Sequence, residues 1–211
     1  MEQSLIQNRV MLLRRKTNYR DPKKVVILVC QGAETEPIYF NNFRKKDCDI
    51  AIHIHRDAGK DPITITKTAK YLKNDQYKGA VIERIFCIYD VDNTPETVLK
   101  KSYKISIDNG LETCISNPCF EIWYLLHFLY STSRYNSYDD VNMDLINHVH
   151  GYAKNKDIFN LLLPNQQKAI ANAKRLEKHH KDVNDDPSIC GSNPSTQIFI
   201  IVEYLNQFVR M

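Results

Sequence analysis

The chain has 211 residues, a formal net charge of +4 and charged side chains at 26% of its positions. This length allows one domain with a substantial core, or one domain with an appended helical part. The small positive balance does not by itself indicate a nucleic-acid-binding protein. It is compatible with a nucleic-acid substrate if the basic residues cluster in the fold.

Six cysteines are spread along the chain, and no two of them form a Cys-x-x-Cys pair. Because no disulfide framework is indicated, a reducing cytosol is the expected compartment. No segment is long and apolar enough to span a bilayer, and the N-terminus has no apolar signal-peptide core. We therefore expect a soluble, cytoplasmic protein with no membrane partner.

Residues 1–22 are polar and basic, and we interpret them as an N-terminal lead-in. Charge runs of this kind are usually solvated, although basic termini sometimes contact nucleic-acid phosphates. The apolar run at residues 25–30 predicts a buried strand of a parallel sheet. A polar loop follows, and the helical spacing of apolar residues predicts a helix over residues 36–46 with Thr35 as its N-cap. This loop carries Gln31, Glu34 and Glu36. It follows the carboxyl end of the strand, which is the place where open α/β sheets bind ligands.

The same strand-then-helix pattern repeats through residue 130. Strands are predicted at residues 49–56, 84–89 and 111–115, and helices at 63–76, 96–108 and 119–130. The alternation at residues 50–56 places that strand near a sheet edge. Together these elements predict an α/β domain over residues 23–130, with a mostly parallel four-stranded sheet flanked by helices.

After residue 131 the composition changes, and helical patterns continue to the end of the chain. Helices are predicted at residues 140–150, 157–163 and 165–181, and a last one, capped by Ser195 or Thr196, runs to residue 209. Residues 131–211 are therefore expected to form a helical extension packed on the sheet domain.

Acidic side chains follow two of the predicted strands. Glu34 and Glu36 follow the first strand, and Asp90 and Asp92 follow the third. If the two strands are neighbours, these carboxylates converge, and clustered carboxylates usually persist because a hard cation compensates them. Mg²⁺ (or Mn²⁺) prefers such oxygen ligands and suits phosphate chemistry. The alternative is that Asp90 and Asp92 only form a turn.

Several blocks of the sequence resemble the RloB family. They are VCQGAETEPIYF at residues 29–40, YDVD at 89–92, SNPCFEIWYLLHF at 116–128 and NPST at 193–196. The third block is the most specific, and the resemblance spans about residues 25–205. RloB proteins are bacterial, resemble TOPRIM-domain nucleases and OLD-type nucleases, and are often encoded beside an ABC-type ATPase. The resemblance implies a TOPRIM-like fold, Mg²⁺-dependent phosphodiester cleavage and a role in phage defence.

The resemblance also implies which residues form the site. The TOPRIM glutamate that directly precedes a glycine falls on Gln31, and the family's later glutamate falls on Glu36. The Asp-x-Asp pair falls on Asp90 and Asp92. The implied catalytic set is completed by Glu121, at the acidic position of the third block. The implied metal ligands are Glu36, Asp90 and Asp92. The resemblance implies a nucleic-acid substrate, DNA or RNA, and an ABC-type ATPase partner, and it leaves homo-oligomerisation open.

The glutamine at residue 31 departs from the family pattern. Glutamine is uncharged and cannot accept a proton at neutral pH, and loss of a general base typically costs roughly 100-fold to 10,000-fold in rate. Three interpretations stay open. The natural protein has this glutamine and uses Glu34 or Glu36 instead, the protein is a binding-only relative, or the glutamine is a deliberate replacement of the catalytic glutamate that leaves the fold intact.

Two further residues of the third block have structural alternatives. Glu121 falls on the family's acidic position, but it can also cap the helix beneath Ser116 or Asn117. His127 falls on the family's histidine position, although a buried structural histidine is the simpler interpretation.

Two other functions compete with the nuclease. One is a non-catalytic binding subunit of a defence complex. The other is a haloacid-dehalogenase-like phosphatase, with Asp90 as nucleophile and Asp92 as general acid/base. For a phosphate-stabilising cation, the candidates are Lys60, Lys100 and Lys101.

Overall fold

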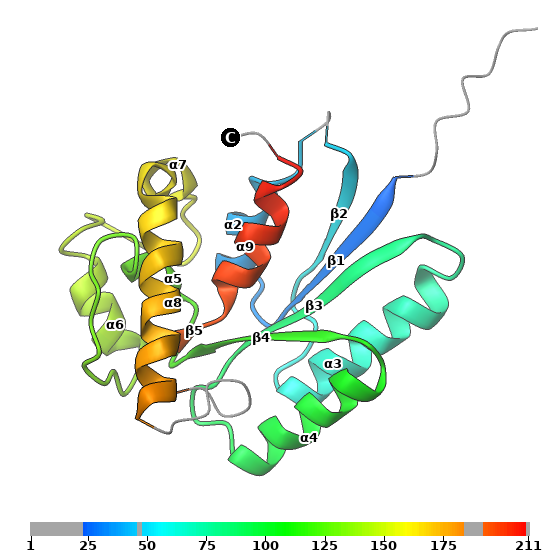
Figure 1. Ribbon diagram of the computed structural model, residues 1–211, viewed down its shortest axis with the longest axis horizontal. Helices are drawn as coiled ribbons and strands as arrows, with labels where there is room; N and C mark the ends of the chain where they lie inside the picture. The colour runs from blue at the N-terminus through cyan, green and yellow to red at the C-terminus, as the bar shows by residue number, and fades with distance from the viewer. Residues whose placement is uncertain (1–22, 46–47, 184–191, 210–211) are drawn as a thin grey trace, which may run out of the picture.

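A five-stranded sheet forms the centre of the computed structural model, which describes residues 23–45, 48–183 and 192–209 (Figure 1). The lead-in predicted for residues 1–22 lies outside the described residues. The strand order is β2-β1-β3-β4-β5; the first four strands are parallel, and β5 is antiparallel to β4. The strands are β1 (Lys24–Cys30), β2 (Ile50–His55), β3 (Ile82–Asp90), β4 (Glu112–Asn117) and β5 (Ser195–Thr196).

Helices cover both faces of this sheet (Figure 1). They are α2 (Thr35–Asn41), α3 (Pro62–Tyr71), α4 (Glu96–Asp108), α5 (Glu121–Leu125), α6 (Tyr138–Leu145), α7 (Phe159–Leu162), α8 (Gln166–Asp182) and α9 (Ile198–Asn206). A π-helical turn, Leu72–Gln76, extends α3, and a 3₁₀ turn, Leu163–Asn165, joins α7 to α8. The α/β class predicted from the sequence is confirmed.

Strand β1 is buried on both faces, as its unbroken apolar run predicts. Val25, Ile27 and Val29 pack in a core cluster with α3 and α4. Val26 and Leu28 point to the opposite face and join the larger cluster, which also contains residues of α2, α5, α8 and α9. The first strand therefore lies between two helical layers, with β2 and β3 as its neighbours.

The ends of several elements differ from the sequence predictions. Helix α2 begins at Thr35, with Glu34 at the N-cap position, and it ends at Asn41, although Phe43 beyond it is still buried. The apolar segment predicted as a helix over residues 119–130 forms only the short α5 and then turns. Packing of these aromatic residues in the core does not require a continuous helix.

The fifth strand was missed by the sequence analysis. Ser195 and Thr196 were predicted to cap the last helix, but they form β5 and pair with Asn117 and Ser116. This pairing also extends β4 through the Ser116–Asn117 dipeptide that was predicted to end it. Thr196 nevertheless accepts a hydrogen bond at its hydroxyl from the N–H of Ile198, the first residue of α9.

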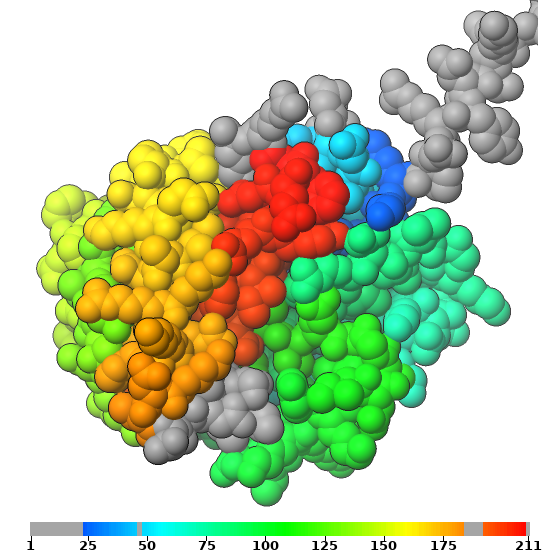
Figure 2. Space-filling view, viewed as in Figure 1, coloured from blue at the N-terminus to red at the C-terminus, as the bar shows by residue number. Residues whose placement is uncertain are grey.

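The C-terminal helical region packs on the sheet through the larger core cluster. Buried residues of α8, such as Leu176, and of α9, such as Ile201, share that cluster with β1 and β3. In the space-filling view, α8 and α9 lie side by side and cover one part of the molecule (Figure 2). In the part of the chain that the structure describes, no helix is long and apolar enough to cross a membrane.

Candidate active site

A pocket of about 330 Å³ lies at the carboxyl ends of β1 and β3, beside the start of α5. It is the place where open α/β sheets bind ligands. The residues that line it come from the loop after β1, from α2, from the end of β3, from α5 and from the loop after α6. They are Gln31, Gly32, Ala33, Glu34, Thr35, Glu36, Asp90, Phe120, Glu121 and Lys154.

Glu36 lies in the first turn of α2 and is only 5% exposed. The Gly32 N–H donates a hydrogen bond of 3.1 Å to its Oε1 atom. Burial raises the pKa of Glu36, and the backbone N–H groups of Glu36 and Gly32 partly offset this effect. A Cβ atom on Gly32 would lie 2.9 Å from the carboxyl carbon of Glu36, so the carboxylate needs glycine at this position.

Gln31 links the ends of β1 and β3. Its Oε1 atom accepts a 2.9 Å hydrogen bond from the Asp90 N–H, and its Nε2 donates to the Lys60 carbonyl at 3.4 Å. Gln31 therefore holds the backbone from which the Asp90 carboxylate projects. Burial raises the pKa of Asp90 well above its ordinary value, and the charges of Glu36 and Glu121 raise it further.

Glu121 is the first residue of α5 and is buried. The Tyr152 hydroxyl donates a 2.9 Å hydrogen bond to its Oε1, and the Thr35 hydroxyl donates to the same atom at 3.4 Å. The N-cap residue of α5, Phe120, makes no side-chain capping bond, and Glu121 is the acidic residue of the first helical turn. Its carboxylate lies in the same pocket as Glu36 and Asp90.

The cation of the pocket is Lys154, which the sequence analysis did not identify. Its Nζ lies 3.9 Å from the centroid of the Tyr138 ring, and its carbonyl oxygen lies 3.4 Å from the Thr35 hydroxyl as an alternative acceptor to Glu121. Burial alone would lower the pKa of Lys154, but Glu121 and the other acidic neighbours outweigh that effect and raise it. Lys154 lies in a loop far along the chain from the acidic motifs, without a sequence signal that links it to them.

The three lysines proposed from the sequence do not line this pocket. Lys60 contributes its backbone carbonyl next to Gln31, at the edge of the site. Lys100 forms an ion pair with Glu96 on α4, and Lys101 is exposed on the same helix.

Asp92 differs from the other predicted site residues. It is exposed, has a positive φ of 43° and does not line the pocket. Its N–H donates a 3.2 Å hydrogen bond to the Pro118 carbonyl, and its charge contributes to the raised pKa of Asp90. Of the five predicted site residues, the structure brings Gln31, Glu36, Asp90 and Glu121 together in one pocket, and Asp92 is not among the lining residues.

His127 is fully buried and lies outside the pocket lining. Its Nδ1 lies 2.9 Å from the Trp123 carbonyl oxygen, to which the ring N–H donates. Burial lowers the pKa of His127 to about 4, so the imidazole is neutral at pH 7. These properties are those of a structural histidine.

The carboxylates of the pocket are hard oxygen ligands of the kind that Mg²⁺ prefers. Within the described residues, no group of three or more His, Cys, Asp and Glu side chains is already arranged to hold a metal ion. A Mg²⁺ site does not need such a group, because this ion usually keeps several waters and binds one or two carboxylates together with substrate phosphate. Glu36 and Asp90 can supply those carboxylates.

The fold and the pocket define an α/β protein with a carboxylate-lined site at the carboxyl edge of a mostly parallel sheet. The model of the RloB-like protein family matches residues 26–205, so the chain belongs to this family. No curated protein and no solved structure gives a match.

Proposed function

We propose that the pocket is the active site of a Mg²⁺- or Mn²⁺-dependent nuclease that cleaves phosphodiester bonds in DNA or RNA. The observation that carries this proposal is the convergence of four acidic side chains with one cation, Lys154, in the lining of one pocket at the strand ends. The acidic side chains are Glu34, Glu36, Asp90 and Glu121. Like charges placed together raise the free energy of the site, and a divalent cation would offset that cost. We further propose that the protein acts in anti-phage defence with an ABC-type ATPase.

When bound, the metal ion would polarise the phosphodiester and lower the pKa of a bound water. Glu36 and Asp90 would hold the ion. Lys154 would bring a positive charge to the phosphate oxygens as negative charge develops there. Tyr152 helps to hold Glu121 in one orientation by donating to its Oε1.

Gln31 limits this chemistry. It has the position of the family's glutamate and orients the Asp90 backbone, but its amide cannot take up a proton at neutral pH. A glutamate at this position would keep an oxygen acceptor for the Asp90 N–H and would add the missing base. We therefore expect the protein with glutamine at residue 31 to be a weak nuclease.

Substitution of this single residue tests the proposal. Gln31→Glu should raise Mg²⁺-dependent cleavage of DNA or RNA by roughly 100-fold to 10,000-fold over the unchanged chain, as expected for a restored general base. A Gln31→Glu, Asp90→Ala double variant is the matched control and should return cleavage to background. If the single variant cleaves neither DNA nor RNA, with Mg²⁺ or Mn²⁺ and with the ATPase partner present, the nuclease proposal fails.

The glutamine itself favours a second candidate, a non-catalytic subunit of the defence complex. In that case alanine at Asp90 would leave protection of cells unchanged, whereas the nuclease proposal requires that protection is lost. The phosphatase alternative has less support. It needs Asp92 in the same pocket as Asp90, but Asp92 is exposed and outside the lining.

A further inference from the structure

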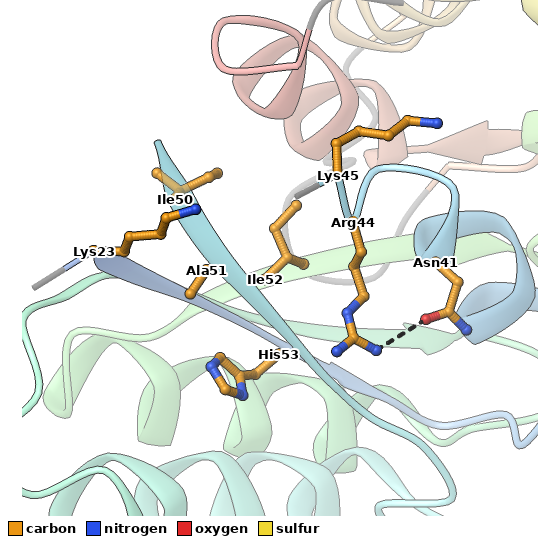
Figure 3. Close-up of a pocket in the computed structure, with 8 residues that line it drawn as sticks. All are labelled: Lys23, Asn41, Arg44, Lys45, Ile50, Ala51, Ile52 and His53. Atoms are coloured by element: carbon orange, nitrogen blue, oxygen red, sulfur yellow. Dashed lines mark hydrogen bonds between the residues drawn. The ribbon is translucent and has the colours of Figure 1, made fainter. Parts of the chain in front are cut away.

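A second and larger pocket, of about 530 Å³, has no role in the proposed reaction (Figure 3). It lies against β2 and the segment that follows α2. Its lining residues are Lys23, Asn41, Arg44, Lys45, Ile50, Ala51, Ile52 and His53.

This basic-edge pocket opens along the outer edge of the sheet. Consecutive residues of a strand point to opposite faces, yet Ile50, Ala51, Ile52 and His53 all line it. A space that contacts both faces of one strand must pass along its edge, and β2 is the edge strand of the sheet. The unpaired backbone groups of that edge therefore border the pocket as well.

Among the described residues that line the pocket, every charged side chain is cationic. These side chains are Lys23, Arg44 and Lys45, and none of the described lining residues carries a carboxylate. The ammonium of Lys23 donates to the Cys48 carbonyl at 2.6 Å. The guanidinium of Arg44 donates to Asn41 Oδ1 at 3.4 Å (Figure 3). Both cations therefore have a protein acceptor beside the strand. The lining therefore suits an anion that presents several acceptor oxygens.

We infer that the basic-edge pocket binds backbone phosphates of the nucleic-acid strand whose cleavage we assign to the acidic pocket. This inference rests on the proposed function. His53 pairs with Ile27 in the sheet, and Gln31 follows Ile27 by four residues. At about 3.3 Å per residue this separation is roughly 13 Å along the strand. It corresponds to about four nucleotide steps of a helical strand at 3.4 Å per step. One substrate can therefore reach both pockets.

The chain between the two pockets contains further basic residues. Arg56 and Lys60 are exposed after β2, with Asp57 as an intervening acid, and the Lys60 backbone bonds Gln31 of the acidic pocket. A phosphate backbone that follows this edge would thus meet positive side chains along its course.

A second copy of the chain fits the edge less well. A two-fold symmetric pairing of β2 strands would bring two copies of this cationic pocket, with Arg44 and Lys45, to one interface. Such like-charge contacts are destabilising. A third explanation is that the cations only protect an edge strand from pairing, as they do in many sheets, and this explanation predicts no affinity for nucleic acid.

The experiment measures binding apart from cleavage. In a full-length Asp90→Ala chain, fluorescence anisotropy follows the binding of short labelled single-stranded RNA and DNA as a function of salt. Adding Arg44→Ala and Lys45→Ala should weaken binding by about 10-fold or more and reduce the salt slope by about one to two. The control pair Lys101→Ala and Lys104→Ala removes the same charge from α4 and should change the affinity less than about twofold.

A charge-preserving pair, Arg44→Lys with Lys45→Arg, guards against a folding defect and should bind within a few-fold of the parent. Unchanged binding in the alanine pair overturns the inference, and so does an equal loss in the α4 control. A change in oligomeric state without a change in oligonucleotide affinity assigns the edge to self-association and also overturns it. Absence of cleavage by Gln31→Glu, with intact binding at this pocket, would instead reject the nuclease proposal alone.

Discussion

At the scale of single residues, the contacts around each carboxylate explain why the pocket can concentrate negative charge. Glu36 receives a backbone N–H, Glu121 is contacted by two hydroxyl groups, and Lys154 lines the same pocket. Charge-assisted hydrogen bonds of this kind are roughly twice as strong as neutral ones. The site is therefore oriented before a substrate or a metal ion binds.

Glycine at residue 32 is predicted to be required for activity. In the Gln31→Glu background, Gly32→Ala should push the Glu36 carboxylate out of position, because the added methyl group would lie 2.9 Å from its carboxyl carbon. A displacement of about 1 Å can cost roughly 100-fold in rate. Initial rates of oligonucleotide cleavage measure this effect.

Gly79→Ala is the comparison for that variant. Gly79 has a φ of +88° and no neighbouring atom within 4 Å of an added Cβ, so the substitution should lower stability through backbone strain alone. Cleavage in folded Gly79→Ala protein should stay at the parental rate. Equal rates for Gly32→Ala and Gly79→Ala would contradict the role of the Gly32–Glu36 contact.

Tyr152 is predicted to act as a positioning residue through Glu121. Tyr152→Phe removes the 2.9 Å hydrogen bond to Oε1 and lets the Glu121 carboxylate turn out of position. It should reduce cleavage in the Gln31→Glu background by about 10- to 100-fold, because small displacements in an active site cost about this much in rate. Tyr135→Phe removes a comparable bond to Asp144 and is the matched control. If both variants lose activity equally, the Tyr152 hydroxyl has no specific function.

At the scale of elements, the start of α3 shows how local chemistry fixes a helix next to the site. Asp61 accepts hydrogen bonds from the N–H groups of Ile63 and Thr64, and Pro62 occupies the first helical position. Helix α3 packs against α4 and β3, which ends at Asp90. Its stability therefore contributes to the position of the strand that carries the site.

Asp61→Ala is expected to cost about 1 kcal/mol in the free energy of unfolding, because an N-cap acceptor is lost. Asp61→Asn keeps an acceptor oxygen and should cost much less. Urea unfolding followed by circular dichroism measures both values. A loss for the asparagine variant as large as that for alanine would show that the charge, and not the capping bond, is responsible.

Some elements were predictable from sequence, and others depended on tertiary contacts. Helix α4 has the predicted bounds, because Pro95 precedes it and Gly110 follows it closely. Strand β5 was not predictable, since two residues form a strand only when a distant partner, β4, is present. The length of α5 was overestimated because an apolar run does not distinguish a long buried helix from a short one followed by buried turns.

Part of the site could be predicted from the sequence, and part of it could not. The acidic loop after β1 and Asp90 could be identified because parallel strands bring their carboxyl ends to one edge. Lys154 and Tyr152 lie in an irregular loop after α6, and only the packing of the C-terminal region brings them to the pocket. Whether Asp92 binds a metal ion stays a prediction.

At the scale of the whole molecule, a buried histidine is expected to shape the pH dependence of stability. The pKa of His127 is about 4 in the folded protein and near 6.5 in the unfolded chain. Below pH 6.5 the unfolded state binds the proton more readily, so this contribution to stability is lost as the pH falls from about 6.5 to about 4. The loss should reach about 1.4 kcal/mol per pH unit at most.

Urea unfolding at a series of pH values measures this contribution. His127→Gln removes the titrating group, and its stability should fall less steeply between pH 6.5 and 4 than that of the parent, whatever its stability at pH 7. Parallel curves for the two proteins would show that His127 does not remain neutral in the folded state.

Metal binding at the acidic pocket tests the central claim most directly. Crystals of the unchanged chain and of Gln31→Glu would be soaked with Mn²⁺, and anomalous difference maps would be calculated. We predict a peak within coordination distance of Asp90 and Glu36 that is absent in Asp90→Ala. A pocket without a peak at saturating Mn²⁺ in both proteins, or a peak only elsewhere, would contradict a metal-dependent active site at this edge of the sheet.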